Sequence, residues 1–201
     1  MNKIIKNTII LTIITLVSGI ALGGVYEITK APIAKANEQA KQEAYKQVFE
    51  DADSFDTLKI EEKEAAAAVK EAGVDGAFIN EAAKAVKGGE DIGYVVTATD
   101  KNGYGGNIKV SVGIREDGTV SGIAILEISE TAGLGMNATE DSFLNQFADK
   151  KTEKFYVSKD GGEGEKVDAL SGATITTRAV TGAVNAALGY YQNVLGGSAN
   201  E

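Results

Sequence analysis

The chain has 201 residues, 43% of them hydrophobic, a formal net charge of −9 and no Cys, His or Trp. Without Cys there is no thiolate-bound iron–sulfur cluster, disulfide or thiol nucleophile, and without His there is no Ser-His-Asp triad, His-ligated haem or imidazole zinc site. The acidic charge argues against nucleic acid as a partner. The length is sufficient for one domain plus an anchor. Any electron chemistry would need an organic cofactor, and we predict no metal site and no catalytic side chain.

The first predicted element is a transmembrane helix. Residues 8–25 form an uncharged apolar stretch that would span roughly 27 Å as a helix, the thickness of a bilayer core. Lys3 and Lys6 precede it, so the positive-inside rule puts the N-terminus in the cytoplasm and the chain from about residue 26 outside. Tyr26 would lie at the outer interface. We therefore expect a single-pass protein of the cell membrane, in contact with lipid, with an extracytoplasmic main domain.

Two features of this segment have alternative explanations. A cleaved signal peptide is the alternative to an anchor, with residues 21–23 as a passable cleavage site, but the apolar run is longer than is usual for such a peptide. Thr8, Thr12, Thr15 and Gly19 share one helical stripe. That stripe would suit packing against other membrane helices, or the hydroxyls simply bond back to their own helix.

The region after the anchor is rich in helix-forming residues. Pro32 predicts the start of a helix that runs from Ile33 to about Glu50, as a stalk. Residues 61–72 predict a second helix, ended by Gly73. Periodicity does not decide whether residues 79–86 form a strand or a helix.

Strand-like alternation follows. Residues 94–99 are β-branched, and residues 100–103 suit a turn. Residues 108–115 alternate apolar and polar side chains, which predicts a strand with one buried and one solvated face. Asp117-Gly118 is a hairpin signal, and residues 120–128 form the partner strand.

The apolar phase of that partner strand changes between Ile125 and Leu126, which indicates a β-bulge. A helix near residues 139–147, a short strand near 154–158 and a Gly-rich acidic loop at 160–165 come next. Antiparallel strands without alternating crossover helices predict an α+β domain, with an antiparallel sheet flanked by helices.

The closing helix, from about Thr176 to Val194, follows an unusual stretch of small and hydroxyl-bearing residues. Residues 168–177 read Asp-Ala-Leu-Ser-Gly-Ala-Thr-Ile-Thr-Thr. A helix N-terminus presents free backbone N–H groups that stabilise a phosphate, and small residues let a ligand approach closely. The alternative is an ordinary Ser/Thr helix cap.

A second Gly-rich segment follows the last long predicted strand. Residues 130–135 read Glu-Thr-Ala-Gly-Leu-Gly, in which two glycines flank a Leu. Such a loop can fold over a flat ligand with its N–H groups facing inward, or it is a plain connection. It is a candidate second wall of one site.

These motifs resemble those of a known family. Ser171 to Thr176, with Asp168 three residues upstream, is similar to the flavinylation motif of the FMN-binding domains in Rnf complexes and sodium-pumping NADH:quinone reductases. The family also carries Gly-Tyr-Gly-Gly, a hairpin and Glu-Thr-Pro-Gly-Leu-Gly. This chain matches them at 103–106 and 130–135, with Ala132 in place of Pro. Order and spacing agree over residues 93 to about 190.

The resemblance implies FMN joined through its phosphate to the hydroxyl of Thr176, by a separate Mg-dependent flavin transferase that uses FAD. It implies that Thr176 is an attachment point and not a catalyst. Arg178, with Asp168, is a candidate to orient the phosphodiester, or lies on a solvated surface. The predicted cofactor-binding residues are Glu130, Thr131, Gly133, Leu134, Gly135, Asp168, Leu170, Ser171, Gly172, Ala173, Thr174, Ile175 and Thr176.

Within the family, an anchor plus an external FMN domain in about 200 residues looks most like RnfG, the flavin-carrying component of the Rnf complex. Its equivalent in the sodium-pumping reductase, NqrC, is usually longer and is the alternative. The implied function is an electron-carrier subunit of a membrane redox pump, a translocase with other membrane subunits as partners and no stand-alone catalysis. A membrane-anchored flavin sensor or assembly module, or a binding domain without flavin, are further alternatives.

The expected organisation has four parts. They are a cytoplasmic N-terminus with the transmembrane helix at 1–28, a helical stalk and the start of the external domain at 29–90, the FMN-binding domain at 91–195, and a flexible tail at 196–201.

Overall fold

The computed structural model describes residues 2–196, in which two compact units meet between Lys41 and Gln42. The first unit consists of helix only. The second holds all strands of the described chain. Helix α1 (Lys3–Val48) begins in the first unit and ends in the second. The second unit therefore starts inside the region that was predicted to form a stalk.

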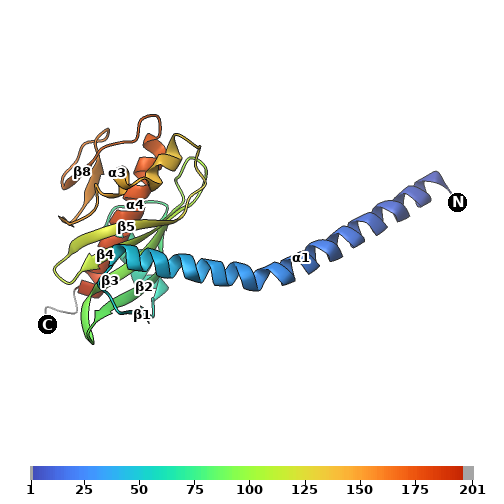
Figure 1. The fold of residues 1–201 in the computed structure, drawn as a ribbon. Helices are drawn as coiled ribbons and strands as arrows, with labels where there is room; N and C mark the ends of the chain where they lie inside the picture. The colour runs from blue at the N-terminus through green and yellow to red at the C-terminus, as the bar shows by residue number, and fades with distance from the viewer. Residues whose placement is uncertain (1, 197–201) are drawn as a thin grey trace. The chain divides into compact units, whose positions relative to one another are not determined.

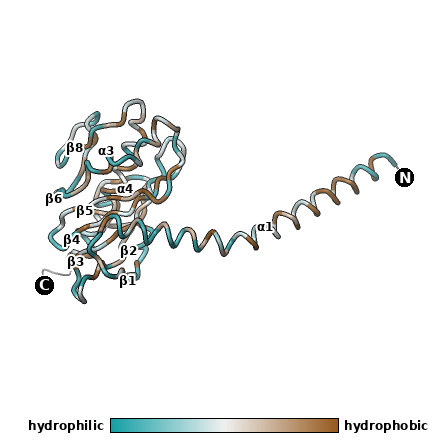
Figure 2. The backbone as a smooth tube through the Cα atoms, viewed as in Figure 1, coloured by the Kyte–Doolittle hydropathy of each residue, from teal (hydrophilic) through white to brown (hydrophobic). Residues whose placement is uncertain are grey.

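The N-terminal part of α1 has the properties of a membrane span. It is the one helix among residues 2–196 that is long and apolar enough to cross a bilayer, by length and composition, and its apolar stretch is exposed (Figure 2). The hydroxyls of Thr8, Thr12 and Thr15 donate to carbonyls three or four residues earlier, at 2.9–3.0 Å. The structure thus shows these hydroxyls bonded to carbonyls of their own helix.

The predicted helix start at Pro32 is wrong, because α1 continues through this residue. Proline removes one backbone hydrogen bond from a helix and crowds the preceding turn. Here strong helix formers such as Ala, Lys, Glu and Gln follow the proline, and the apolar stretch precedes it. The loss of one bond in a helix of 46 residues does not end it.

The second unit is built on a six-stranded antiparallel sheet in which each strand pairs with the next along the chain (Figure 1). This confirms the α+β prediction. Residues 79–86, left undecided by periodicity, belong to a strand, because they pair antiparallel with residues 91–98 after the chain turns back at Gly88 and Gly89, both with positive φ. The strands are β1 (Ser54–Leu58), β2 (Ala77–Lys87), β3 (Glu90–Asp100), β4 (Ile108–Arg115), β5 (Thr119–Glu127) and β6 (Lys150–Lys151).

Helices cover both faces of this sheet. Helices α4 (Thr174–Tyr190) and α2 (Glu62–Glu71) pack with Val110, Val112 and Ile114 of β4 in the main core. On the other face a smaller core joins the last residues of α1 to β2, β3 and β5. The predicted solvated face of β4 is therefore wrong: Ser111 and Gly113 are buried. The sequence pattern of β4 does not reveal that the end of another helix covers its polar face.

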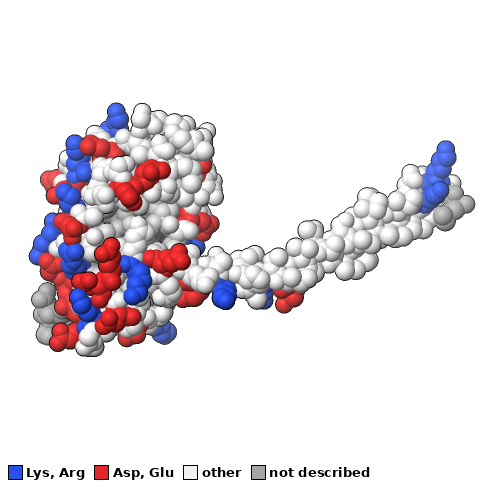
Figure 3. All heavy atoms as spheres, in the orientation of Figure 1, with Lys and Arg blue, Asp and Glu red and all other residues white. Residues whose placement is uncertain are grey.

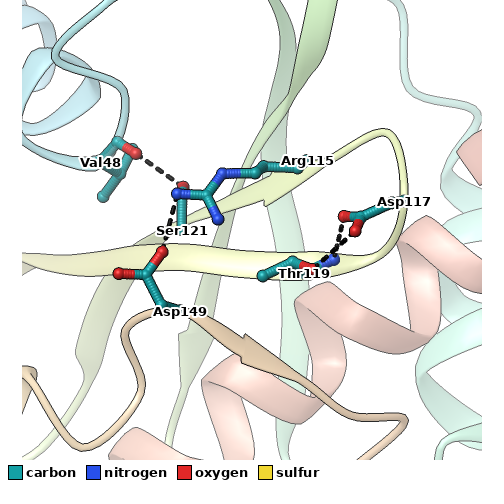
Figure 4. Close-up of polar contacts among 6 residues, drawn as sticks. All are labelled: Val48, Arg115, Asp117, Thr119, Ser121 and Asp149. Carbon is teal, nitrogen blue, oxygen red and sulfur yellow. Dashed lines mark hydrogen bonds and ion pairs between the residues drawn. The ribbon is translucent and has the colours of Figure 1, made fainter.

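The predicted bulge in β5 is confirmed. Lys109 pairs with Glu127 and Val110 with Ile125, which leaves Leu126 as the extra residue. A second, unpredicted bulge leaves Ser121 unpaired, and its hydroxyl donates to the carbonyl of Val48, the last residue of α1, at 2.6 Å (Figure 4). This bond fixes the end of α1 to the sheet.

The remaining elements form a smaller layer beside the main sheet. They are η1 (Gly135–Thr139), α3 (Asp141–Leu144), β7 (Phe155–Val157) and β8 (Glu165–Val167), whereas η2 (Tyr191–Leu195) continues α4 and packs on the main core. The predicted helix near 139–147 is present but short. Strand β8, parallel to β7, was not predicted and begins at the end of the predicted acidic loop. The predicted tail lies outside the described residues except for Gly196.

Candidate functional site

The start of α4 carries the hydroxyl cluster. The helix begins at Thr174, two residues earlier than predicted, and its N-cap is Ala173, with no side-chain cap bond. Ser171 is exposed and does not cap. The ordinary Ser/Thr cap therefore does not account for this cluster. Thr176 lies in the first turn with 1% of its surface exposed.

The turn before α4 is held by Thr177. Its Oγ1 accepts the N–H of Leu170 at 3.1 Å and donates to the carbonyl of Ala173 at 3.0 Å. Gly172, at φ +73°, supplies the left-handed conformation that this turn needs. The hydroxyl of Thr177 is thus committed to the backbone, whereas no hydrogen bond of the Thr176 hydroxyl is found in the described part of the chain.

Two more side chains support the segment that leads into this turn. Gln146 pairs with the backbone of Asp168, accepting its N–H at 2.6 Å, and the Ser158 hydroxyl accepts the N–H of Ala169 at 3.1 Å. Both side chains come from the smaller layer. Neither was predicted, because neither residue belongs to a motif.

The two charged candidates each form an ion pair with a residue outside the hydroxyl cluster. Arg178 forms a double ion pair with Asp160, which raises the pKa of Arg178 and lowers the pKa of the Asp160 carboxyl. Asp168 pairs with Lys166 at 3.0 Å, a hydrogen bond that raises the pKa of Lys166. Exposed ion pairs of this kind contribute little to the free energy of folding.

The loop at residues 130–135 folds over the start of α4. Gly133 has a φ of +74°, and the carbonyl of Thr131 accepts the N–H groups of Leu134 and Met136, each at 3.1 Å. Gly135 packs directly against the hydroxyl of Thr176. A Cβ at Gly135 would lie 2.6 Å from Thr176 Oγ1.

A third loop, at residues 103–106, completes the site. The N–H of Gly105 donates to Glu130 Oε1 at 3.2 Å. Gly105 leaves no room for a Cβ, which would clash with the carbonyl of Ser129. Glu130 is half-buried and lies between this loop and Gly135, so its side chain connects two walls of the site.

Together these loops enclose a cavity of about 560 Å³, a volume typical of small-molecule sites. Tyr104, Leu134 and Ile175 line it with exposed fractions of 72%, 43% and 46%. In residues 42–196 the other large hydrophobic side chain so exposed is Phe78. The full lining is Tyr104, Glu130, Thr131, Leu134, Gly135, Gly172, Ala173, Thr174, Ile175 and Thr176.

The chemistry of this lining fits FMN. The exposed apolar side chains provide a surface for a flat aromatic ring, and the Thr176 hydroxyl can be esterified by a phosphate. Gly135 and Gly172 lack the Cβ atoms that would narrow the cavity at Thr176 and at Leu134. On the face of the domain that Figure 3 draws, acidic and basic side chains are intermixed.

The structure brings most of the predicted site residues together. Nine of them line the cavity, whereas Gly133, Asp168, Leu170 and Ser171 do not. The contact of these nine with FMN stays a prediction. Tyr104 is a lining residue that was not among the predicted site residues, although it belongs to the Gly-Tyr-Gly-Gly motif that carried the resemblance.

Comparison with known proteins bears on the whole chain. Residues 103–189 match the model of the FMN-binding domain, and residues 1–48 match the RnfG N-terminal region. The G subunit of the proton-translocating ferredoxin:NAD(+) oxidoreductase complex of Clostridium ljungdahlii is 37% identical over 98% of this chain and 96% of its own length. The chain belongs to the RnfG family of Rnf complex subunits. All cavity-lining residues lie within the FMN-binding match.

Two further similarities concern the sequence and the fold. The G subunit of the Na(+)-translocating ferredoxin:NAD(+) oxidoreductase complex of Acetobacterium woodii is 32% identical over 95% of this chain and 93% of its own length. The solved structure of the C subunit of Na(+)-translocating NADH-quinone reductase from Parabacteroides distasonis has a TM-score of 0.52 and 20% identity, over 80% of this chain and 94% of that one. The latter likeness concerns the fold alone.

Proposed function

We propose that the chain is the electron-carrier subunit of a membrane-bound, ion-translocating ferredoxin:NAD⁺ oxidoreductase complex, with FMN joined through its phosphate to Thr176. One observation carries this proposal. The cavity inside the FMN-binding match has a hydroxyl, that of Thr176, packed against Gly135 and without a hydrogen-bond partner in residues 2–196. Full-length relatives named for protons and for Na⁺ support ion translocation as the coupled process.

FMN, when bound, supplies reversible electron transfer at its ring system. The residues of this chain hold it. Thr176 provides the ester oxygen, and Tyr104, Leu134 and Ile175 offer the apolar surface for the ring. A link through the phosphate is distant from the ring, so hydrogen bonds and nearby charges set the ring's reduction potential.

The charges around the cavity support a covalent attachment. The lining contains one carboxylate, Glu130, and neither Lys nor Arg. A free phosphate group carries up to about two negative charges at neutral pH. It would be repelled by Glu130 and would gain only the N-terminal end of α4 as a positive partner. A covalent bond to Thr176 removes the need for a cationic pocket.

Maturation and assembly bring three kinds of partner. A separate flavin transferase would deliver the flavin phosphate from FAD, and the other subunits of the complex would exchange electrons with the flavin. Membrane lipid would surround the apolar part of α1, which has no acidic side chain between Lys6 and Glu27. The chain therefore does not provide an ion path by itself.

The attachment is tested by co-producing the full chain with a flavin transferase and looking for flavin fluorescence on a denaturing gel. We expect a fluorescent band for the natural sequence and for Thr139→Ala, a control outside the cavity, and none for Thr176→Ala. Trypsin should release residues 167–178 as one peptide that contains every candidate hydroxyl, and fragmentation then locates the flavin. A band that persists in Thr176→Ala, or no band in the natural sequence, contradicts the proposal.

The role as carrier is tested in the assembled complex. We expect the Thr176→Ala chain to co-purify with the other subunits while ferredoxin-dependent NAD⁺ reduction is lost. A complex that keeps full activity without this flavin would instead indicate a sensor or assembly module.

The proposed orientation places the N-terminus in the cytoplasm and residues 42–196 outside. Because the chain has no Cys, single cysteines report on it without background. We expect a membrane-impermeant maleimide to label Ser54→Cys in intact cells, and Asn2→Cys only after lysis, since both positions are exposed. The reverse pattern contradicts the orientation.

A further inference from the structure

We propose that Glu130 is the base that accepts the proton of the Thr176 hydroxyl during attachment of the flavin phosphate. This inference rests on the proposed attachment at Thr176 and adds a catalytic role for a residue of the acceptor chain itself. A threonine hydroxyl is a weak nucleophile and needs an adjacent base to become reactive.

The geometry around Gly135 carries the inference. The position that a Cβ of Gly135 would occupy lies 2.6 Å from Thr176 Oγ1 and 2.8 Å from Glu130 Oε2. The hydroxyl and the carboxylate therefore border one small space, which the missing side chain of Gly135 leaves open. A proton can cross such a space through one water molecule.

The carboxylate is also held in place. Glu130 Oε1 accepts the N–H of Gly105 at 3.2 Å, which leaves the second oxygen, Oε2, on the side of Gly135. Glu130 is the one carboxylate among the residues that line the cavity. No second acid or base of comparable strength stands beside Thr176 in the lining.

The same arrangement distinguishes Thr176 from its neighbours. Thr177 has its hydroxyl committed to Leu170 and Ala173. Thr174 also lines the cavity, but the hydroxyl nearest to the position of a Gly135 Cβ, next to Glu130 Oε2, is that of Thr176. The proximity to a base thus selects one hydroxyl of the cluster.

The chemical step balances without an oxidant or reductant. The donor is a dinucleotide of flavin whose two halves are joined by a pyrophosphate. Thr176 Oγ1 forms a bond to the flavin-side phosphorus, the bond from that phosphorus to the bridging oxygen breaks, and a nucleoside monophosphate leaves. The hydroxyl proton passes to Glu130. The neutral carboxyl that results does not repel the new phosphodiester anion.

The test measures the initial rate of flavin attachment to the full-length apo chain, in detergent, with purified flavin transferase and FAD at several pH values. Glu130→Gln keeps an oxygen that can accept the Gly105 N–H but removes the base. We expect its rate to fall about 100-fold or more at neutral pH, as for other general bases. Glu130→Asp should recover part of the rate. Glu140→Gln, an exposed control outside the cavity, should keep the natural rate.

The pH dependence separates catalysis from folding. The ratio of the natural rate to the Glu130→Gln rate should shrink as the pH falls, because protonation removes the base from the natural chain, while titration of the transferase cancels in the ratio. Equal rates, or a ratio that does not change with pH, overturn the proposal. A natural chain that acquires no flavin would instead refute the proposed function. That outcome is measured on the natural chain alone, without the Glu130→Gln variant.

Discussion

Thr177 Oγ1 accepts the backbone N–H of Leu170 at 3.1 Å, across the turn that presents the hydroxyl cluster at the start of α4. The same hydroxyl donates to the carbonyl of Ala173, so one buried side chain closes both ends of the turn. Two adjacent threonines thus have different roles. Thr177 shapes the turn, and Thr176 carries the hydroxyl that we propose as the site of flavin attachment.

Replacing Thr177 by Val should therefore destabilise the fold. The change keeps the shape of the side chain but leaves the N–H of Leu170 without its partner, at a cost of about 1–3 kcal/mol in the free energy of unfolding, whereas the carbonyl of Ala173 keeps its bond from the backbone N–H of residue 177. Urea unfolding of the full chain measures this cost. Thr177→Ser should keep most of the stability and the flavin attachment. Equal stability of the Val and natural chains would contradict the role of the hydroxyl.

The end of α1 provides a second prediction. Ser121 donates to the carbonyl of Val48, and a Cβ at Gly113 would clash with the Ser121 hydroxyl. Ser121→Ala should lower the free energy of unfolding by about 1 kcal/mol, and Gly113→Ala by about 1–3 kcal/mol because it overpacks a buried position. The exposed Ser54→Ala serves as a control that should change little. A Gly113→Ala chain of natural stability would show that α1 does not pack here as described.

Asp100 gives a pH dependence with a definite sign. It is buried, and its desolvation raises the pKa of the carboxyl more than the hydrogen bonds from Asn102 lower it. The folded state therefore binds the proton more tightly than the unfolded state. The stability from Asp100 is fully present below its ordinary pKa of 3.8 and is lost as the pH rises through the raised value.

The comparison with Asp100→Asn isolates this effect. The Asn variant can still accept the Asn102 N–H, and it should gain stability relative to the natural chain as the pH rises from about 4 to about 7. Asp160→Asn is a control of opposite sign, because Arg178 lowers the pKa of Asp160 and the benefit of that pair is lost as the pH falls. Denaturant unfolding at each pH gives both slopes. A flat Asp100→Asn difference would contradict the assignment.

Local sequence signals predicted the elements that depend on neighbours in the chain. The hairpin at Asp117-Gly118 and the bulge at Leu126 follow from turn chemistry and from a change of phase within one strand. The site motifs were found for the same reason, since Gly-rich loops and hydroxyl clusters are visible without tertiary structure.

The features that the sequence did not reveal depend on distant contacts. Ser111 reads as a solvent-facing residue, and only the packing of the end of α1 on that face of the sheet explains its burial. Gln146 supports the backbone of Asp168 from 22 residues earlier in the chain, and no local pattern distinguishes it from a surface glutamine. Pro32 was misjudged because a helix-breaking preference was treated as decisive.

Replacing Arg178 tests whether a cation outside the cavity lining takes part in flavin attachment. Its guanidinium is paired with Asp160 on the surface. Arg178→Gln should therefore leave the yield of covalent flavin unchanged on a fluorescence gel, in the same co-production experiment as Thr176→Ala. A marked loss of flavin in a chain that remains folded would indicate that Arg178 leaves Asp160 to contact the phosphate during attachment.

The space beside Gly135 lies between the Thr176 hydroxyl and the Glu130 carboxylate, and one methyl group should fill it. Gly135 is buried, and a Cβ there would meet Thr176 Oγ1 and the Glu130 side chain. Gly135→Ala should thus lower stability by about 1–3 kcal/mol through overpacking and also abolish flavin attachment, because the hydroxyl loses its approach to the phosphate and to Glu130. Gly122→Ala is the matched control: its Cβ would meet nothing within 4 Å, so both readouts should stay natural. If Gly135→Ala folds and is flavinylated at the natural rate, the hydroxyl is reached from another side, and the site described around Gly135 is not the one where attachment takes place.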